Sequence, residues 1–172
     1  MGQVARGGEA RVKLGVLSDT HDNLTAIEAA EKAFKEARVE RVLFAGDFCA
    51  PFAVARMKGF GVPIVAVFGN NDGDKLLLKE RGEGFCDLAE APRELEVGGR
   101  RILLMHFPWL LEAVAKSGEF DLIVYGHTHE PEIRRVGRTL IVNPGECGGW
   151  LKGKKTLAIV DLETMEAELV EL

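Results

Sequence analysis

The fold is decided by the stretch VKLGVLSDTHDN, residues 12–23, in which an apolar run stops abruptly at a cluster of polar residues. An apolar run of this length predicts a buried β-strand, and the polar cluster predicts a loop at its carboxyl end. The chain continues with Ile27, Phe34 and Ala37, whose spacing places them on one face of an α-helix. Residues 12–37 therefore predict a strand, a loop and a helix.

The same unit occurs twice more along the chain. RVLFAG, residues 41–46, precedes DFCAP and a short helix through Met57. PIVAVFG, residues 63–69, precedes NNDGD and the helical stretch KLLLKERG, residues 75–82. Three consecutive strand–helix units predict a parallel sheet covered by helices.

The second half of the chain predicts further strands. RRILLMHF, residues 100–107, precedes a helix from about Pro108 to Lys116, and DLIVYGHTHEP, residues 121–131, follows that helix. Four more strand-like runs come after it, namely EIRRV (132–136), RTLIVNPGE (138–146), KTLAIVDLE (155–163) and AELVEL (167–172). We expect these runs to form a second sheet packed on the first, which gives an α/β sandwich.

Length and composition indicate one globular domain. A chain of 172 residues is long enough for one sizeable core, so we expect a loose tail over residues 1–11 and a single domain over residues 12–172. The net charge of −5 disfavours binding to nucleic acid or to an anionic membrane surface.

Two further features indicate a soluble cytoplasmic protein. No apolar stretch approaches the roughly 18 residues that a membrane span requires, and no secretory signal precedes the domain. The three cysteines, Cys49, Cys86 and Cys147, are an odd number without C-x-x-C spacing, which is typical of reduced thiols.

Polar side chains follow the predicted strands at their carboxyl ends. They are Asp19, His21, Asp47, Asn70, Asn71, Asp72, His106, His127 and His129. Taken singly, an aspartate after a strand is usually a turn former or a helix cap, and a histidine there is usually an ordinary loop residue. Taken together they indicate a site, because ligands of open α/β sheets bind outside the carboxyl ends of the strands.

The chemistry of this set indicates a metal centre. Carboxylate, amide and imidazole donors suit Mn, Fe, Zn or Ni, and no thiolate favours a softer metal. Two such ions sharing one carboxylate bind a phosphoryl group and lower the pKa of a bridging water towards about 7, so that a hydroxide becomes the nucleophile. We therefore expect no side-chain nucleophile.

At five places the sequence resembles the calcineurin-like metallophosphoesterases. The ordered motifs are DTH at 19–21, GD at 46–47, GNND at 69–72, a single His106, and GHTH at 126–129. The small size and the VNPGE run, residues 142–146, resemble most closely the single-domain YfcE-like phosphodiesterases. The resemblance implies a four-layer αββα sandwich of two mixed sheets flanked by helices. It also implies a metal-dependent phosphodiesterase that acts on a small diester, and a homodimer.

The resemblance also implies a role for each metal ligand. Asp19, His21 and His129 would hold the first metal, Asn70, His106 and His127 the second, and Asp47 would bridge them. The two divalent ions would most naturally be Mn²⁺, with Ni²⁺, Fe, Zn²⁺ and Mg²⁺ as alternatives.

Two departures from the family pattern bear on catalysis. Asn71 stands where many members carry a histidine that protonates the leaving group, and an amide donates a hydrogen bond but delivers no proton. Asp72 then has no histidine to orient and is expected only to cap or turn. Asn70, Asn71 and Asp72 remain the candidate catalytic residues, and the missing acid favours diesters. Glu146 replaces the serine of close relatives, which alters the contacts expected there.

Other functions remain open. One alternative is a non-catalytic metal-binding scaffold related to the retromer subunit, which also lacks that histidine, and another is a phosphomonoesterase. GGWLKGKK, residues 148–155, resembles a phosphate-binding loop, but a strand follows it where a helix is required. We expect Trp109, Leu110 and Leu111 to pack within a helix, whereas Trp150 fits either packing or substrate contact.

Overall fold

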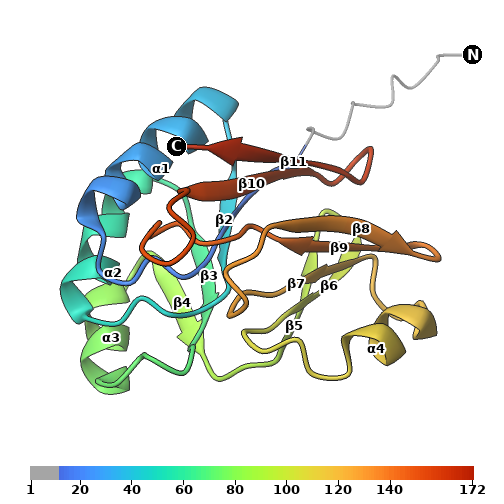
Figure 1. The fold of residues 1–172 in the computed structure, drawn as a ribbon, viewed down its shortest axis with the longest axis horizontal. Coiled ribbons are helices and arrows are strands. Elements are labelled where there is room, and N and C mark those ends of the chain that lie inside the picture. The colour runs from blue at the N-terminus through green and yellow to red at the C-terminus, as the bar shows by residue number, and fades with distance from the viewer. Residues whose placement is uncertain (1–11) are drawn as a thin grey trace, which may run out of the picture.

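The computed structural model describes residues 12–172, which form two mixed β-sheets packed face to face with helices on both outer sides (Figure 1). This arrangement confirms the four-layer αββα sandwich. The predicted tail, residues 1–11, lies outside the described residues. No helix among the described residues is long and apolar enough to cross a membrane.

The first sheet carries the three predicted strand–helix units. Its strand order is β11-β10-β1-β2-β3-β4, in which β1 to β4 run parallel and β10 and β11 are antiparallel to their neighbours. The strands are β1 (Lys13–Leu17), β2 (Arg41–Phe44), β3 (Ile64–Val67), β4 (Cys86–Ala89), β10 (Thr156–Asp161) and β11 (Glu166–Glu171). The helices of this half are α1 (Leu24–Ala37), α2 (Pro51–Met57), the short 3₁₀ helix η1 (Lys58–Phe60) and α3 (Lys75–Gly82).

The second sheet has the strand order β5-β6-β7-β9-β8. Its strands are β5 (Arg93–Val97), β6 (Arg100–Leu104), β7 (Leu122–Val124), β8 (Glu132–Val136) and β9 (Thr139–Asn143). One helix, α4 (Leu111–Ser117), packs on its outer side (Figure 1). Because β6, β7 and β9 are parallel, their carboxyl ends share one edge of the sheet.

Three expectations about individual elements are wrong. The last two strands, β10 and β11, belong to the first sheet and not to the second, since β10 pairs with β1 and brings Val160 opposite Leu14. Strands β4 and β5 were not expected at all. Helix α4 begins at Leu111 and not near Pro108, because Leu110 has a left-handed backbone conformation that no α-helix contains.

Three apolar layers hold the four layers of structure together. Side chains alternate along each buried strand, so that Val16 of β1 faces the second sheet while Leu17 faces the helices. A third layer, which includes Ala115 of α4, joins this helix to the second sheet. Gly15 has no side chain because the ring of Phe34 occupies its place, at 2.5 Å from where a Cβ atom would stand. The two sheets therefore present their strand ends at fixed positions.

Candidate metal centre

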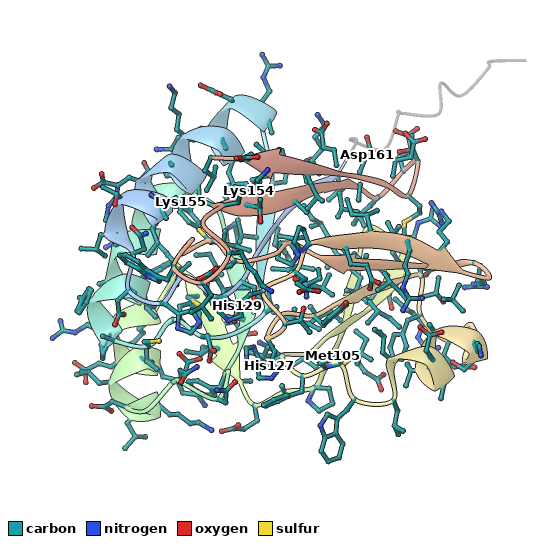
Figure 2. The ribbon with its side chains drawn as sticks, in the orientation of Figure 1. Met105, His127, His129, Lys154, Lys155 and Asp161 are labelled. Carbon is teal, nitrogen blue, oxygen red and sulfur yellow. The ribbon has the colours of Figure 1, made fainter. Side chains whose placement is uncertain are left out.

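The structure brings all nine predicted site residues to the carboxyl ends of strands. The loop after β1 carries Asp19 and His21, the loop after β2 carries Asp47, and the loop after β3 carries Asn70, Asn71 and Asp72. His106 follows β6, whereas His127 and His129 follow β7 and lie between the two sheets in Figure 2. Four ligand candidates thus come from the first sheet and three from the second.

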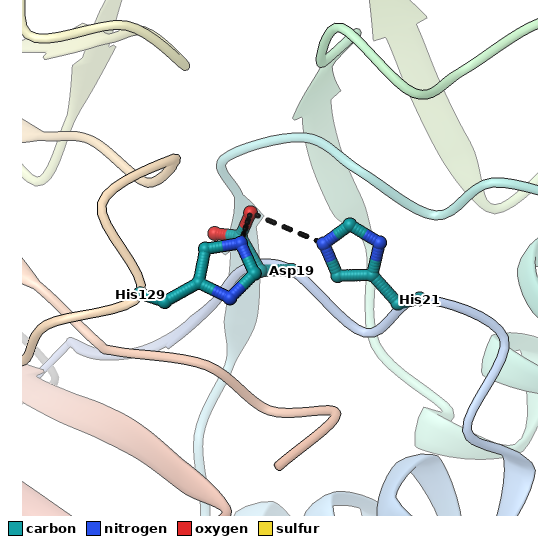
Figure 3. Close-up of side chains that lie close together, drawn as sticks. All are labelled: Asp19, His21 and His129. Carbon is teal, nitrogen blue, oxygen red and sulfur yellow. Dashed lines mark ion pairs between the residues drawn. The ribbon is translucent and has the colours of Figure 1, made fainter. Parts of the chain in front are cut away.

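The first group of ligand atoms surrounds the carboxylate of Asp19. Its Oδ1 lies 3.3 Å from Nε2 of His129 and 3.7 Å from Nε2 of His21. Figure 3 shows both rings directed at this one oxygen. The three side chains place one donor atom each within 4.8 Å of one another, which is the spacing of ligands around a shared ion.

The second group surrounds the amide oxygen of Asn70. Oδ1 of Asn70 lies 2.9 Å from Nε2 of His106 and 3.0 Å from Nδ1 of His127. The other ring nitrogen of His106, Nδ1, lies 2.7 Å from the carbonyl oxygen of Ala45 and donates to it. In a neutral imidazole this leaves Nε2 with a free lone pair that faces the amide oxygen. A cation placed between His106 Nε2 and Asn70 Oδ1 would accept a lone pair from each of them.

Asp47 lies between the two groups. Its Oδ2 is 3.5 Å from Nε2 of His21 and 3.6 Å from Nε2 of His106. Asp19, Asp47 and His106 also place donor atoms within 4.8 Å of one another. Asp47 thus occupies the position expected of a carboxylate shared by two ions, although its role as a ligand stays a prediction.

Buried atoms without a partner show that these residues fit a metal. Among the described residues, three buried side-chain atoms make no hydrogen bond, and all belong to the first group: Asp19 Oδ1, His21 Nε2 and His129 Nδ1. Burial of an unpaired carboxylate oxygen costs free energy, so native proteins rarely leave one without a compensating contact. A divalent cation bound by Asp19, His21 and His129 would satisfy Asp19 Oδ1 and His21 Nε2, whereas His129 Nδ1 faces Glu146.

The backbone around the ligands is strained and closely packed. Five predicted ligands have positive φ angles, namely Asp19 (53°), His21 (40°), Asp47 (65°), His127 (66°) and His129 (60°). Such values are uncommon outside glycine and cluster at functional sites. Two motif glycines permit the close approach, since a Cβ atom would stand 2.1 Å from Oδ1 of Asp47 at Gly69 and 2.0 Å from the hydroxyl of Ser18 at Gly126.

Asp72 braces two of the ligand-bearing loops. Its buried carboxylate accepts hydrogen bonds from the backbone N–H groups of Asp47 (3.0 Å), Cys49 (2.8 Å) and Gly69 (2.7 Å). Burial raises the pKa of the Asp72 carboxyl, and these three donors oppose that rise. The loops after β2 and β3 are therefore fixed to each other, which is a larger role than the cap or turn expected from the sequence.

Glu146 contacts the first group from behind. Its Oε1 lies 3.4 Å from Nδ1 of His129, on the opposite side of the ring from Asp19. The same buried carboxylate accepts backbone hydrogen bonds from Trp150 (2.7 Å), Leu151 (3.0 Å) and Lys152 (3.0 Å). Burial favours a raised pKa for Glu146, but these donors outweigh it and leave the pKa lowered, so the group is a carboxylate.

Nearby carboxylates shift the pKa values of the two histidines in the first group, His21 and His129. The pKa values of His21 and His129 are raised, in each case chiefly by the contact with Asp19. The pKa of Asp19 is lowered, because contacts with His129, His21 and Ser18 outweigh the effect of burial. Burial lowers the pKa of His127, which favours the neutral ring that a metal requires.

Neither the Ser18 hydroxyl nor the Cys49 thiol, both beside the centre, is set up as a nucleophile. The Ser18 hydroxyl is buried and donates to Asp19 Oδ2. The Cys49 sulfur lies 3.3 Å from Nδ1 of His21, but burial and the surrounding carboxylates raise the pKa of this thiol to about 12. The thiol is therefore protonated at neutral pH.

The sequence did not reveal several contacts of this centre. The positions of Glu146 behind His129 and of Cys49 beside His21 depend on loop conformations that no motif encodes. Trp109 and Leu110, expected to pack within a helix, are exposed instead, because α4 starts after them. The phosphate-loop resemblance of residues 148–155 is correctly rejected, since no helix follows it.

Comparison with known proteins gives one consistent family. The family model described as "Calcineurin-like phosphoesterase superfamily domain" matches residues 12–165. Phosphodiesterase MJ0936 from Methanocaldococcus jannaschii is 36% identical over 159 residues, which cover 90% of this chain and 96% of that protein.

Two solved structures extend this comparison. The structure described as that of a novel archaeal phosphodiesterase has 35% identity and a TM-score of 0.88, over 94% of this chain and 100% of that one. A structure of Vps29 with zinc from Entamoeba histolytica has 18% identity and a TM-score of 0.65, over 93% of this chain and 99% of that one. The latter likeness shows a common fold alone.

Proposed function

Because the chain belongs to the calcineurin-like phosphoesterase superfamily, a family of metal-dependent phosphoesterases, we propose that it hydrolyses phosphodiesters at a dinuclear metal centre. One observation carries the proposal. Seven donor side chains converge in two groups joined by Asp47. Three buried atoms of this set, Asp19 Oδ1, His21 Nε2 and His129 Nδ1, have no hydrogen-bond partner among the described residues.

The proposed ligands divide as the resemblance implied. Asp19, His21 and His129 would hold one ion, Asn70, His106 and His127 the other, and Asp47 both. Bound ions would supply the positive charge that holds a phosphoryl group, and would lower the pKa of a coordinated water towards about 7, which gives the expected hydroxide nucleophile.

Neighbouring backbone groups orient the proposed ligands of the metal centre. The Ala45 carbonyl fixes the tautomer of His106 and so directs Nε2 into the centre. The backbone N–H of His127 donates to Asp19 Oδ2 at 3.1 Å, which joins the loop after β7 to the loop after β1. Since Ser18 and Cys49 are not set up as nucleophiles, attack by water is the proposed route.

Asn71 supports a diester over a monoester. The residue is exposed at the edge of the centre and offers an amide in place of the acid that would protonate a poor leaving group. Phosphodiesterase MJ0936 and the archaeal phosphodiesterase structure are named for the same activity.

A non-catalytic scaffold is the second candidate, but it explains less. The fold alone does not separate the two, because Vps29 shares it. A scaffold has no need of a complete set of mutually directed metal donors, whereas a metal-dependent catalyst does. The use of Mn²⁺, the cytoplasmic location and a homodimer stay proposals, and light scattering of the purified protein tests the last.

The test compares an activated diester with the matching monoester. Protein stripped with a chelator and reloaded with Mn²⁺, Ni²⁺, Zn²⁺ or Mg²⁺ is assayed on bis(p-nitrophenyl) phosphate and on p-nitrophenyl phosphate. We expect turnover of the diester that exceeds turnover of the monoester, disappears on stripping and is absent in His127→Ala. Full diester activity in His127→Ala would refute the proposal, and preference for the monoester would favour a phosphomonoesterase.

A further inference from the structure

Two exposed aromatic side chains border the candidate metal centre, one beside each group of ligand candidates. Phe107 directly follows His106, and its ring centre lies 4.1 Å from that of His127, at a tilt of 46°. Trp150 lies on the loop after β9, and its indole Nε1 donates a 3.0 Å hydrogen bond to the backbone oxygen of His21. His127 belongs to the group around Asn70 and His21 to the group around Asp19, so each aromatic residue borders one group.

Both side chains are exposed yet held in place. Phe107 is 40% exposed and Trp150 is 64% exposed. The loop that carries Trp150 is fixed by the Glu146 carboxylate, which accepts the Trp150 backbone N–H at 2.7 Å. Exposed aromatic surface beside a site marks a place where a ligand is bound. Ordered rings also lose little conformational freedom when a ligand packs on them.

In the described segments that carry the two rings, residues 105–111 and 148–154, no lysine or arginine is free of an acidic partner. The segment MHFPWLL, residues 105–111, contains no lysine or arginine. On the other side, Lys152 is close in sequence to Trp150, but its Nζ is paired with Glu130 at 2.7 Å. The net charge of −5 further disfavours a substrate with additional phosphates. The two rings therefore suit uncharged groups.

We propose that Phe107 and Trp150 bind the ester groups of the substrate, and that the substrate class is phosphodiesters in which at least one alcohol is a flat, uncharged ring. This inference rests on the proposed phosphodiesterase function. A diester held at the metal centre carries two ester groups, one for each aromatic side chain, whereas a monoester carries only one. Stacking on an aromatic side chain strengthens binding by about tenfold for each ring engaged.

The experiment varies one ester group while the leaving group stays constant. The substrates are the p-nitrophenyl esters of methyl phosphate, phenyl phosphate and thymidine 5′-phosphate, each assayed with metal-loaded protein. We expect KM for the two ring-bearing esters to be about tenfold below KM for the methyl ester, with kcat similar for all three. If KM is lower for the thymidine ester than for the phenyl ester, the preferred ring of the substrate is a nucleobase. If KM is lower for the phenyl ester, the preferred ring is a simple aryl group.

Variants show whether the two residues cause the preference. Of Trp150→Ala and Phe107→Ala, the variant that lacks the ring beside the varied ester group should reduce the ratio of the methyl KM to the phenyl KM by about fivefold or more, and the other should raise both KM values alike. An unchanged ratio in both variants would overturn the assignment. Trp150→Phe should keep most of the ratio, since it retains a flat ring without the hydrogen bond to His21. Leu169→Ala, which removes a side chain of similar exposure (42%) from β11, is the matched control and should keep the full ratio.

A binding measurement gives a second readout that needs no turnover. The chain has two tryptophans, so Trp109→Phe leaves Trp150 as the one indole. Phenyl phosphate should change its fluorescence at a concentration about tenfold below that required of methyl phosphate. Equal KM values for the three esters, or an equal response to both probes, would overturn the assignment. Absence of turnover on all three esters with two ions bound would instead refute the proposed function.

Discussion

The side-chain amide of Asn71 donates a 2.8 Å hydrogen bond to Oδ2 of Asp47, and the backbone N–H of Asn71 donates a 2.8 Å hydrogen bond to Oδ1 of the same carboxylate. Both oxygens of the proposed bridging ligand are thus held by one residue. Asn71 therefore does more than stand in for an absent histidine, because it also orients Asp47 towards the centre.

Replacement of Asn71 by histidine should add a proton donor at the edge of the centre. The side chain at this position is exposed, so an imidazole has room. We expect Asn71→His to raise kcat/KM for diesters with poor leaving groups by about tenfold or more, since general acid catalysis contributes about 10²- to 10⁴-fold. A series of aryl diesters with leaving groups of increasing pKa measures the gain. Asn71→Gln is the control, and an unchanged series with two ions bound would contradict the missing-acid account.

The number of bound ions should follow the two groups of ligands. We expect wild-type protein to hold two Mn²⁺ ions per chain after dialysis, His127→Ala to hold one, and Asp47→Ala to hold fewer than one. Elemental analysis by mass spectrometry measures the ratio. Leu169→Ala, far along β11, should retain both ions. Two ions in His127→Ala would show that this imidazole is not a ligand.

Loss of the Asp72 carboxylate should destabilise the fold. Asp72→Ala leaves three backbone N–H groups without an acceptor, and each buried group of this kind costs about 1–3 kcal/mol. Because two of the three are only partly buried, we expect a total loss near the lower end of their sum, about 3–5 kcal/mol. Urea unfolding of metal-free protein measures it. Asp74→Ala removes only the cap of α3, whose carboxylate accepts from Leu77, and should cost about 1 kcal/mol. Equal losses in the two variants would contradict the bracing role of Asp72.

Removal of Glu146 should weaken the first metal site. A carboxylate behind a metal-binding imidazole orients the ring and raises its basicity, and loss of such a partner typically costs about 10- to 100-fold in metal affinity. We expect Glu146→Ala to show that loss in a competitive metal titration, and Glu146→Gln to show a smaller one because it still accepts backbone hydrogen bonds. Glu130→Ala, an exposed carboxylate nearby, should bind metal normally. Normal affinity in Glu146→Ala would exclude the role.

The metal-free protein should lose stability as the pH rises above about 6.5. His21 and His129 have raised pKa values in the fold, so the folded state binds their protons more tightly than the unfolded chain does. This stabilisation is complete below the unfolded pKa of 6.5 and disappears as the pH rises through the folded pKa. The midpoint of thermal unfolding in chelator, followed from pH 6 to pH 9, measures the loss. His129→Gln should show a shallower decline, and an equally steep decline would assign it to other groups.

Much of the fold follows from local patterns in the sequence. Each of the three strand–helix units pairs with its neighbour, so local order predicts the parallel strands β1 to β3 of the first sheet, but not β4. The place of β10 depends on contacts with β1 across most of the chain, and its apolar pattern fits a central position in either sheet. Strand β5, RELEV, was missed because its charged residues conceal the alternation of Leu95 and Val97.

The sequence predicted the ligand candidates of the site but not the residues that hold them in place. Ligand candidates such as Asp19 and His106 stand two residues after the end of a strand, and a strand fixes the direction of the residues that follow it closely. Asp72 and Glu146 act through backbone N–H groups of loops, and the sequence does not specify which loop a carboxylate will meet. The exposure of Trp109 likewise depends on the left-handed backbone conformation of Leu110, which a leucine at that position does not predict.

The division of the ligands between the two sheets has a consequence for the order of events during synthesis. The loops after β1, β2 and β3 leave the ribosome well before His106, His127 and His129. A nascent chain would then hold three of the four proposed ligands of the first ion and two of the four of the second. The backbone N–H of Gly148 also bonds to the Asp19 carbonyl at 2.9 Å, and this contact forms later still. We expect metal binding to be one of the last steps of folding, because it requires that the two sheets have already packed on each other.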